Sequence, residues 1–354
     1  MKIAIEARAL KARGGGIKTY TEQLIRHLPG LDSGNEYIVI SDKPRHELLL
    51  PLWLQWQMPR IIQKLKPDVV HFTKADVPKR KMAPTVVTIF DIIPLLYPAG
   101  QTLTRRLYWP RALQRAADKN DQIITISETS KEDIIHAFGV HEDRITVTPL
   151  AVDTEHFRLT LDGGQQKKPY VLFVGTLESR KNVPLLIRAF ARMANDVPHQ
   201  LVIAGRRDSD YKNIIREVEG QSMQGRVKIL DFVEDNDLPV LYSGAQLFVW
   251  PSIYEGWGFP PQEAMACGTP VIVSDGGALP EVVGRAGEVV PFSTDSLPAR
   301  TRDVEFEESL AAKMLSVLND QTKRKQMRQT GLARVRQFSW QEVAEKTAAV
   351  YKQV

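Results

Sequence analysis

The sequence predicts an α/β fold of two doubly wound parallel-sheet domains in tandem, and three observations support this prediction. The chain has 354 residues, beyond the size at which a single hydrophobic core usually stops growing. Short apolar runs alternate with helical patterns, which is typical of a parallel sheet with helices on both faces. The alternation stops once, at 161–168 (LDGGQQKK), and then restarts. We therefore predict a domain boundary near residue 165, between domains 1–165 and 166–337.

Ten apolar runs are the expected strands, five on each side of that boundary. In order along the chain they are 2–8, 36–41, 68–72, 85–91, 122–127, 170–175, 200–205, 226–232, 245–252 and 270–275. The first is followed by a glycine loop at 14–16 that opens into an amphipathic helix, and 182–194 reads as a helix of the second domain. Because parallel sheets bind ligands at the carboxyl ends of their strands, two such edges facing each other would form one cleft.

Composition excludes several classes of protein. With 43% hydrophobic and 25% charged residues and no apolar run of about 18 residues, the chain is not expected to span a membrane. The N-terminus lacks the order of a signal peptide, so we expect a cytoplasmic protein. Its one cysteine, Cys267, excludes an internal disulfide framework and is expected to be a buried filler. The net charge of +5 suits phosphate-bearing ligands or an anionic membrane surface, but it is too diffuse to predict nucleic-acid binding.

The segment after the strand that ends at Gly175 predicts an anion site. Arg180 and Lys181 stand just before a helix that is expected to begin near Asn182, a good N-cap residue. Two cations and free backbone N–H groups then converge on one place. The alternative is that both charges are solvated surface residues.

A second ligand-binding feature is expected at 255–270 (EGWGFPPQEAMACGTP). Its glycines allow close approach of backbone, and Pro260 suits the first turn of a helix. The amides near Gly258 and Phe259 would point at a ligand. Glu263 is placed in the first helical turn, where the helix dipole strengthens its acidity and where it could accept hydrogen bonds from a diol; Glu255 precedes it in the loop. Alternatively, Glu263 only caps the helix and Glu255 is a surface acid.

The stretch 255–287 resembles the E-x7-E signature of retaining glycosyltransferases of family four, and 175–183 (GTLESRKNV) is similar to that family's donor phosphate motif. The match also takes in 125–134, 232–252 and the N-terminal glycine loop, which is nearly the whole chain. This resemblance implies the GT-B fold, in which two Rossmann-like domains face each other across an interdomain cleft. It also implies that the last segment, 338–354, crosses back to the N-terminal domain.

The resemblance further implies roles for individual residues. Glu263 matches the acid that holds the donor ribose, and Glu255 matches the one near the transferred sugar, which the amides around Gly258 and Phe259 also approach. Pro260 of the same turn is expected in the donor site. Arg180 and Lys181 match the pair that neutralises the donor diphosphate. These cations and helix N-termini could stabilise the leaving group without a metal or another cofactor. In the family's front-face route the leaving phosphate helps to deprotonate the acceptor, so no protein nucleophile is required.

Other matched positions complete the expected site. Phe232 and Val233 match the wall that holds the nucleobase, and Gly15 and Gly16 match the loop that closes over the diphosphate or the acceptor. Many relatives carry a histidine where this chain has Phe90, so we expect its role to be absent or to move to Asp91. The chain also has Ala151 and Asp231 where relatives often have glycine. These two departures do not change the predicted class of enzyme, but they make its substrate harder to predict.

Rival functions are disfavoured by particular features. The D-x-D strings at 208–210 and 235–237 look like loop and turn residues and are not expected to bind metal. A glycoside hydrolase needs one carboxyl group with a raised pKa, whereas Glu263 is expected to be acidic. The loop at 14–16 lacks the G-x-G-x-x-G of a dehydrogenase. An epimerase of the same fold, or a non-catalytic sugar-binding protein, stays open as an alternative.

The acceptor is expected to bind the N-terminal domain. Segments 52–66 and 103–119 mix basic residues with Trp53, Trp56, Tyr108 and Trp109, as an interfacial helix or a site for a phosphorylated lipid carrier would. Core packing with a solvated face is the plainer interpretation. The resulting prediction is transfer of a hexose from a UDP- or GDP-linked sugar to a saccharide or lipid-linked acceptor, with possible peripheral contact at the inner membrane face.

Overall fold

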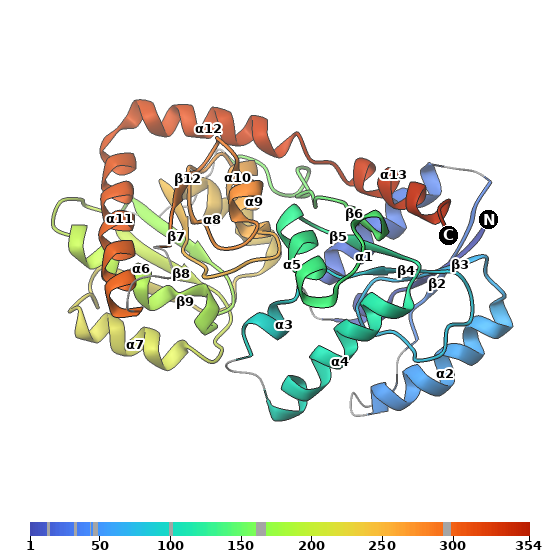
Figure 1. The fold of residues 1–354 in the computed structure, drawn as a ribbon. Helices are drawn as coiled ribbons and strands as arrows, with labels where there is room; N and C mark the ends of the chain where they lie inside the picture. The colour runs from blue at the N-terminus through green and yellow to red at the C-terminus, as the bar shows by residue number, and fades with distance from the viewer. Residues whose placement is uncertain are drawn as a thin grey trace. The chain divides into compact units, whose positions relative to one another are not determined.

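The computed structural model describes residues 1–12, 15–31, 34–42, 44, 49–98, 102–160, 168–292 and 299–354. They form two compact units (Figure 1). The N-terminal unit comprises Met1–Leu150 and Ser339–Val354, and the C-terminal unit comprises Ala151–Phe338. The predicted boundary near residue 165 lies outside the described residues.

The N-terminal unit contains a six-stranded parallel sheet of order β2-β1-β3-β4-β5-β6. Its strands are β1 (Lys2–Glu6), β2 (Glu36–Ile40), β3 (Val69–Phe72), β4 (Thr85–Thr88), β5 (Gln122–Thr125) and β6 (Ile145–Val147). β1 lies next to the edge strand β2, and Ile3 is in register with Tyr37 of β2 on one side and with Val69 of β3 on the other. The predicted runs account for the first five strands, and β6 was not predicted.

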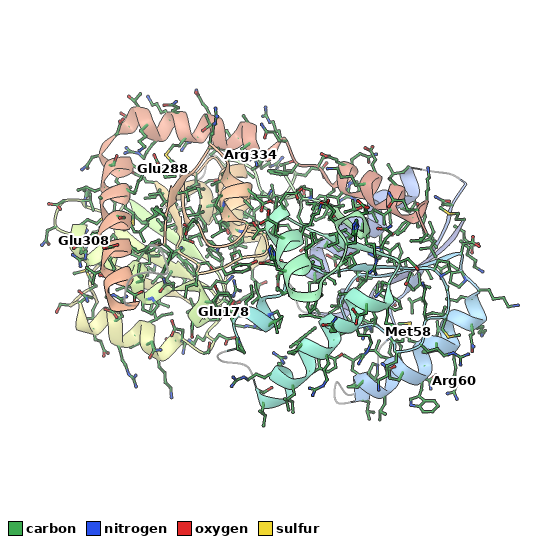
Figure 2. The ribbon with its side chains drawn as sticks, in the orientation of Figure 1. Met58, Arg60, Glu178, Glu288, Glu308 and Arg334 are labelled. Atoms are coloured by element: carbon green, nitrogen blue, oxygen red, sulfur yellow. The ribbon has the colours of Figure 1, made fainter. Side chains whose placement is uncertain are left out.

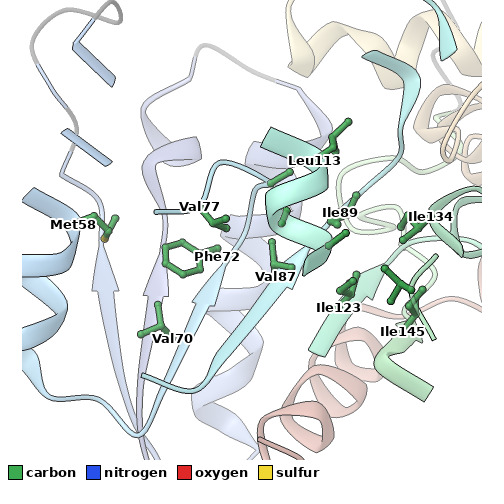
Figure 3. Packing of buried hydrophobic residues seen from close by; sticks show 14 of the residues in the cluster. Met58, Val70, Phe72, Val77, Val87, Ile89, Leu113, Ile123, Ile134 and Ile145 are labelled. Atoms are coloured by element: carbon green, nitrogen blue, oxygen red, sulfur yellow. The ribbon is translucent and has the colours of Figure 1, made fainter. Parts of the chain in front are cut away.

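Helices cover both faces of this sheet. They are α1 (Gly16–His27), α2 (Leu50–Leu65), α3 (Ile93–Leu96), α4 (Leu103–Lys119), α5 (Glu128–Phe138) and α13 (Trp340–Tyr351), with short 3-10 turns η1 (Arg8–Lys11), η2 (Leu28–Gly30) and η4 (Glu142–Arg144). Figure 3 shows the core on one face, where Phe72 and Val87 of the sheet pack with Met58 of α2, Leu113 of α4 and Ile134 of α5. α2, α4 and α5 therefore share one face.

The opposite face is closed by α1 and α13 through buried polar side chains. The His71 ring is hydrogen-bonded to the Tyr351 hydroxyl at 2.7 Å and to the Thr88 hydroxyl at 2.8 Å. The Tyr20 hydroxyl of α1 lies 3.0 Å from the same Thr88 oxygen. Burial lowers the pKa of His71 to about 3, so the ring is neutral. This chain of hydrogen bonds ties the C-terminal helix to the N-terminal sheet.

The C-terminal unit contains a second six-stranded parallel sheet, of order β12-β11-β10-β7-β8-β9. Its strands are β7 (Tyr170–Val174), β8 (Gln200–Ala204), β9 (Val227–Leu230), β10 (Leu247–Trp250), β11 (Val271–Ser274) and β12 (Glu288–Val290). The chain moves outward from β7 through β8 and β9, then returns to β10 and moves outward the other way. The strand order reverses between β7 and β10, the switch point at which doubly wound sheets bind ligands.

Two groups of helices pack in this unit. The helices are α6 (Val183–Met193), α7 (Tyr211–Gly220), α8 (Leu238–Gly244), α9 (Phe259–Ala266), α10 (Leu279–Val283), α11 (Ala299–Asn319) and α12 (Gln321–Val335), with 3-10 turns η5 (Ser179–Lys181) and η6 (Asp235–Asp237). α6 packs with α7 and α11, and α9 packs with α8, α10 and α12. Arg334 of α12 (Figure 2) donates hydrogen bonds to the carbonyl oxygens of Glu281 and Val282 and so caps the end of α10. Within the described ranges, no helix has the length and apolarity to cross a bilayer.

Candidate functional site

The candidate site lies at the switch point of the C-terminal sheet. Gly175 follows β7, and a Cβ atom at this position would lie 2.6 Å from the Trp250 ring at the end of β10. The amide of Ile253 donates to the carbonyl oxygen of Arg180 at 2.8 Å. The loops that follow β7 and β10 are therefore in direct contact, and glycine is required at 175 to let the indole ring approach.

This contact brings Arg180, Lys181 and Glu255 together as an ionic cluster. Lys181 Nζ lies 2.5 Å from Glu255 Oε1, and Arg180 Nη1 lies 2.9 Å from Glu255 Oε2. Glu178, labelled in Figure 2, contributes a second acid 2.6 Å from Arg180 Nη2. Trp250 supports the cluster, because its ring lies 4.8 Å beneath Lys181 Nζ and its Nε1 donates to Glu255 Oε1 at 3.1 Å.

Burial and charge act against each other in the ionic cluster. Lys181 and Glu255 are each only 8% exposed. Burial lowers the pKa of Lys181, although the charge of Glu255 opposes the shift. Burial would raise the pKa of Glu255, but the charges of Lys181 and Arg180 outweigh it and hold that pKa below its usual value. The Glu255 carboxylate is therefore ionised near neutral pH, where it pairs with the Arg180 guanidinium and the Lys181 amine.

This pairing was not predicted, because the sequence analysis considered Arg180 and Lys181 for the donor diphosphate and Glu255 for the transferred sugar. Lys181 and Glu255 are 74 positions apart in the chain, and the switch point joins them. A parallel bridge also fixes Glu255, whose carbonyl oxygen accepts from Ala278 at 2.9 Å. A Cβ at Gly277, where φ is +63°, would lie 2.3 Å from that oxygen. Sequence reasoning missed the supporting roles of Trp250 and Gly277; the Gly-Gly pair at 276–277 was the available signal.

Glu263 corrects two predictions. α9 begins at Phe259, so Glu263 is its fifth residue and lies beyond the first turn, where the dipole field has weakened. Burial raises the pKa of Glu263 to about 7, whereas a lowered value was predicted. The Tyr242 hydroxyl donates to its Oε2 at 2.7 Å, which offsets only part of the cost of burial. Among the described residues Oε1 has no hydrogen-bond partner, so this oxygen can accept from a ligand.

The start of α9 is built as the sequence suggested. Gly258 occupies the N-cap position and Pro260 the second helical position, where a missing N–H costs no helix bond. The φ of Gly258 is 174°, an extended value that any residue adopts, so the need for glycine is spatial. A Cβ there would lie 3.0 Å from a methyl group of Leu279. By contrast, Asn182 precedes α6 in the left-handed region (φ 57°, ψ 35°) and its side chain does not form the predicted cap, since capping residues usually adopt extended angles.

The predicted nucleobase wall follows β9. Phe232 is 63% exposed, and Val233 beside it is partly buried. A single exposed ring is common on protein surfaces, so exposure alone does not mark a binding site. The structure places this ring at the carboxyl edge of the same sheet as the ionic cluster.

Three predicted site residues belong to the N-terminal unit. Gly15 (φ +106°) precedes α1 and Gly16 is its first residue, whereas position 14 of the predicted loop lies outside the described residues. Asp91 follows β4, and its Oδ1 accepts from the amide of Ile93 at 3.0 Å. Phe90 packs edge-on against Tyr20 with ring centres 5.1 Å apart. At the position where many relatives have a histidine, this chain therefore has a ring that packs against another aromatic side chain.

The aromatic residues of α2 and α4 divide between interior and surface. Trp53, Tyr108 and Trp109 are partly buried, and the Tyr108 hydroxyl donates to Asp76 at 2.6 Å. Trp56 is 64% exposed. Packing therefore explains most of these rings, but not Trp56.

The two D-x-D strings lie in a loop and in η6. Asp210 is buried and accepts from the Asn213 amide at 2.8 Å, while Asp208 accepts from the amide of Ser209. Throughout the part of the chain that the structure describes, there is no group of three or more His, Cys, Asp and Glu side chains arranged to hold a metal ion.

Comparison with known families gives two matches in sequence order. Residues 14–156 match the model described as Glycosyltransferase Family 4, and residues 162–334 match the model described as Glycosyl transferases group 1. O-antigen chain mannosyltransferase B of Escherichia coli is 32% identical over 323 residues, which cover 87% of this chain and 79% of that protein.

Solved structures show the same fold at lower identity. Sucrose-phosphate synthase from Thermosynechococcus elongatus superposes with a TM-score of 0.79 at 21% identity, covering 99% of this chain and 98% of that one. Anabaena HepE, crystallised with UDP-glucose, superposes with a TM-score of 0.73 at 19% identity and covers 100% of both chains. The two parallel sheets described above are thus those of the GT-B fold.

Proposed function

Because the chain belongs to glycosyltransferase family 4, we propose that it is a retaining, metal-independent enzyme that transfers a hexose from a nucleoside diphosphate sugar. The acceptor would be a hydroxyl group of a saccharide or a lipid-linked saccharide, in the synthesis of a cell-surface polysaccharide or glycolipid. The ionic cluster is the single observation that best supports this proposal, because it offers two basic side chains at a sheet switch point.

The ionic cluster suits a leaving diphosphate. Negative charge grows on the β-phosphate as the glycosidic bond breaks, and preorganised cations stabilise that charge. Arg180 and Lys181 would exchange part of their pairing with Glu255 for the phosphate oxygens, and the freed carboxylate would accept from sugar hydroxyls. Two cations in this position make a metal ion unnecessary for neutralising the phosphate.

Glu263 would hold the donor ribose. Its Oε1 is available, and a ribose diol can donate to both carboxylate oxygens once the group is ionised. Tyr242 would remain as the fixed donor to Oε2. The amides at the start of α9, Phe232 and Val233 would complete the donor site.

The acceptor and the membrane are a second part of the proposal. α2 and α4 share one face of the N-terminal unit and expose Leu52, Trp56, Leu103 and Leu107. Arg60 (Figure 2), Lys64, Arg105 and Arg106 are exposed on the same two helices. Apolar and basic side chains in this combination suit contact with an anionic lipid surface. Equal partition of the protein between neutral and anionic liposomes would contradict this part alone.

An epimerase of the same fold is the alternative. The mannosyltransferase relative gives it no support. An epimerase would convert a nucleotide sugar without any acceptor, so product analysis in the absence of acceptor distinguishes the two activities.

The proposal is tested by thermal unfolding with a panel of nucleotide sugars and free nucleoside diphosphates. A ligand present at 100 times its dissociation constant stabilises the folded state by about 2.7 kcal/mol, so a true donor should raise the melting temperature by several degrees. No response to any nucleotide would contradict the proposal. NMR of the product formed with the active donor would then test retention through the anomeric configuration.

A further inference from the structure

A charged pair that the proposed site does not use lies at the carboxyl edge of the C-terminal sheet. Arg207 follows β8 and Asp231 follows β9. Arg207 Nε lies 2.7 Å from Asp231 Oδ1, and Nη2 lies 2.9 Å from Oδ2. The two planar groups therefore meet side by side through two parallel hydrogen bonds, although their side chains are 57% and 62% exposed.

The backbone holds Arg207 beside the loop of the ionic cluster. Arg207 forms a parallel bridge with Leu177, three residues before Arg180. The Leu177 amide donates to the carbonyl oxygen of Arg206 at 2.9 Å, and the Asp210 amide donates back to Leu177 at 3.1 Å. A Cβ at Gly205 would lie only 1.8 Å from the Gly175 carbonyl oxygen, so the loops after β7 and β8 touch.

The guanidinium group is also oriented from its other side. Its carbon lies 4.5 Å from the centre of the Tyr211 ring, at the start of α7. The hydrogen bond from Arg207 holds the pKa of Asp231 below its usual value, so the carboxylate is ionised at neutral pH. An exposed ion pair such as Arg207–Asp231 contributes little to the stability of the fold, because solvent screens its charges. Its position next to Phe232, the exposed ring of the expected nucleobase wall, suggests a role in binding.

The pair retains hydrogen-bonding capacity beyond its own two bonds. A carboxylate offers about four lone-pair positions, of which Arg207 fills two, and a guanidinium has five N–H groups, of which Asp231 accepts two. The two lone pairs of Asp231 that stay free point to opposite sides of the pair, so only Oδ2 can accept from a ligand beside Nη2, whose second N–H can donate to the same ligand. A ligand that fits this edge presents a donor beside an acceptor.

We propose that Arg207 and Asp231 read the base of the nucleotide donor and favour guanine, an inference that rests on the function proposed above. Guanine presents the N1 donor beside the O6 acceptor, which match Oδ2 and the N–H of Nη2, and its N2 amino group then lies on the carboxylate side. Uracil can also place its N–H beside a carbonyl oxygen, but its second carbonyl oxygen then faces the carboxylate in place of an amino group. Adenine has an acceptor at N1, which the carboxylate also repels.

The test begins with calorimetric affinities of the unmodified protein for GDP, IDP and UDP. Hypoxanthine lacks only the N2 amino group, so IDP removes one hydrogen bond to Asp231. We expect GDP to bind at least tenfold more tightly than UDP and roughly tenfold more tightly than IDP, since one hydrogen bond to a charged group contributes about that factor. UDP binding as tightly as GDP would overturn the inference.

The Asp231→Asn variant with xanthosine diphosphate provides a chemical rescue. Xanthine keeps N1–H but has a carbonyl oxygen at C2, which an asparagine amide can match by donating a hydrogen bond. We expect the variant to bind GDP about tenfold more weakly and to bind XDP more tightly than GDP. An unchanged preference for GDP in Asp231→Asn would overturn the inference, and a purely structural role of Asp231 would not produce the switch to XDP.

A matched control is available in the same unit. Arg192 Nη1 and Glu308 Oε1 lie 3.2 Å apart in an ion pair of α6 and α11 that is similarly exposed. Glu308→Gln should leave all nucleotide affinities unchanged. If the unmodified protein binds UDP but does not prefer GDP, the inference fails while the proposed function survives; if it binds none of the nucleotides, the proposed function itself fails.

Discussion

Each sheet has a buried carboxylate at its switch point, but the charge around it differs. In the N-terminal unit Glu6 ends β1, and its Oε1 accepts from the amide and the Nε of Arg8 at 2.8 and 2.5 Å. Asp76 adds a second buried acid nearby, whose carbonyl oxygen accepts from Arg8 Nη2 at 3.3 Å. In the C-terminal unit, Glu255 instead lies between the two cations of the ionic cluster.

The difference indicates which ligand each edge can take. At the N-terminal edge Arg8 pairs with the Glu6 carboxylate and Lys74 pairs with the Asp76 carboxylate at 3.7 Å, while Glu6 Oε2 has no hydrogen-bond partner within the described ranges. This carboxylate oxygen can accept from a hydroxyl group.

At the C-terminal edge Arg180 and Lys181 share the carboxylates of Glu255 and Glu178, and their N–H groups can donate to a phosphate. The same strand arrangement therefore presents a carboxylate oxygen without a partner at one edge and two clustered basic side chains at the other, and we expect the donor phosphates at the C-terminal edge.

Among the changes that test this comparison, Arg8→Ala is expected to have the largest effect, which is on the stability of the N-terminal unit. Removal of the cation leaves Glu6 buried and uncompensated, which costs about 3–5 kcal/mol of unfolding free energy. Urea denaturation of the full chain measures the loss, and Arg8→Lys should restore part of it. Donor nucleotide affinity should stay the same wherever the protein is folded. A loss below about 1 kcal/mol would show that Arg8 is not the structural counter-charge.

The double variant Arg180→Ala with Lys181→Ala removes the cations of the other edge. We expect turnover to fall about 10³-fold, equivalent to about 4 kcal/mol, because the leaving diphosphate loses its electrostatic stabilisation. Steady-state kinetics with the donor found in the thermal panel measures the loss. Arg192→Ala, an exposed cation of the same unit, is the control. Full activity of the double variant would refute the assignment of the ionic cluster.

His71 makes the N-terminal unit sensitive to acid. Its pKa is about 3 in the folded protein and 6.5 in the reference state, so the unfolded chain binds more protons between these values. The contribution of His71 to stability should be fully present above pH 6.5. Below that pH the free energy of unfolding should fall by up to about 1.4 kcal/mol per pH unit. His71→Gln, measured by denaturation between pH 5 and pH 8, should flatten this part of the profile. An identical slope in both proteins would assign the acid sensitivity to other groups.

Glu263 gives the C-terminal unit the opposite pH dependence. Its folded pKa of about 7 lies above the reference 4.5, so it stabilises the fold below pH 4.5 and loses that contribution as the pH rises towards 7. Ribose binding requires the carboxylate, so affinity for a nucleotide sugar should weaken by up to about tenfold per pH unit below 7. A nucleotide sugar is the suitable probe, because its diphosphate does not titrate in this range. Glu263→Gln should remove the dependence, and an unchanged profile would contradict the role.

Removal of metal should produce the smallest effect. If cations of the chain stabilise the leaving group, activity should be equal with and without EDTA after dialysis. Loss of activity that Mg²⁺ or Mn²⁺ restores would show that Arg180 and Lys181 do not suffice at the C-terminal edge.

Much of the fold could be predicted from the sequence, because long apolar runs separated by helical patterns are strong signals. β6 and β12 were missed, since each is an edge strand of three residues and is too short to show a pattern. The residues of the ionic cluster were each expected at a donor site, but their pairing was not. Contacts between Lys181 and Glu255, 74 positions apart, depend on strand order, which local pattern does not specify.

The state of Glu263 was the clearest error. Local sequence suggested a helix start with a strengthened acid, whereas the pKa is set by burial and by Tyr242, which comes from a different helix. Desolvation depends on the packed environment, so residue spacing cannot reveal it. The exposed Arg207 and Asp231 pair was likewise hidden, because it joins the ends of two separate strands.

The central claim is that the C-terminal switch point binds the diphosphate of a nucleotide sugar through the ionic cluster. Calorimetric titration of the nucleotide sugar selected by the thermal panel into the unmodified protein and into the Arg180→Ala, Lys181→Ala variant tests it most directly. We predict one donor site per chain in the unmodified protein and a loss of affinity of about 100-fold or more in the variant, since hydrogen bonds to charged groups each contribute about 1.5–3 kcal/mol. Equal affinity in the two proteins, with both folded, would contradict the account.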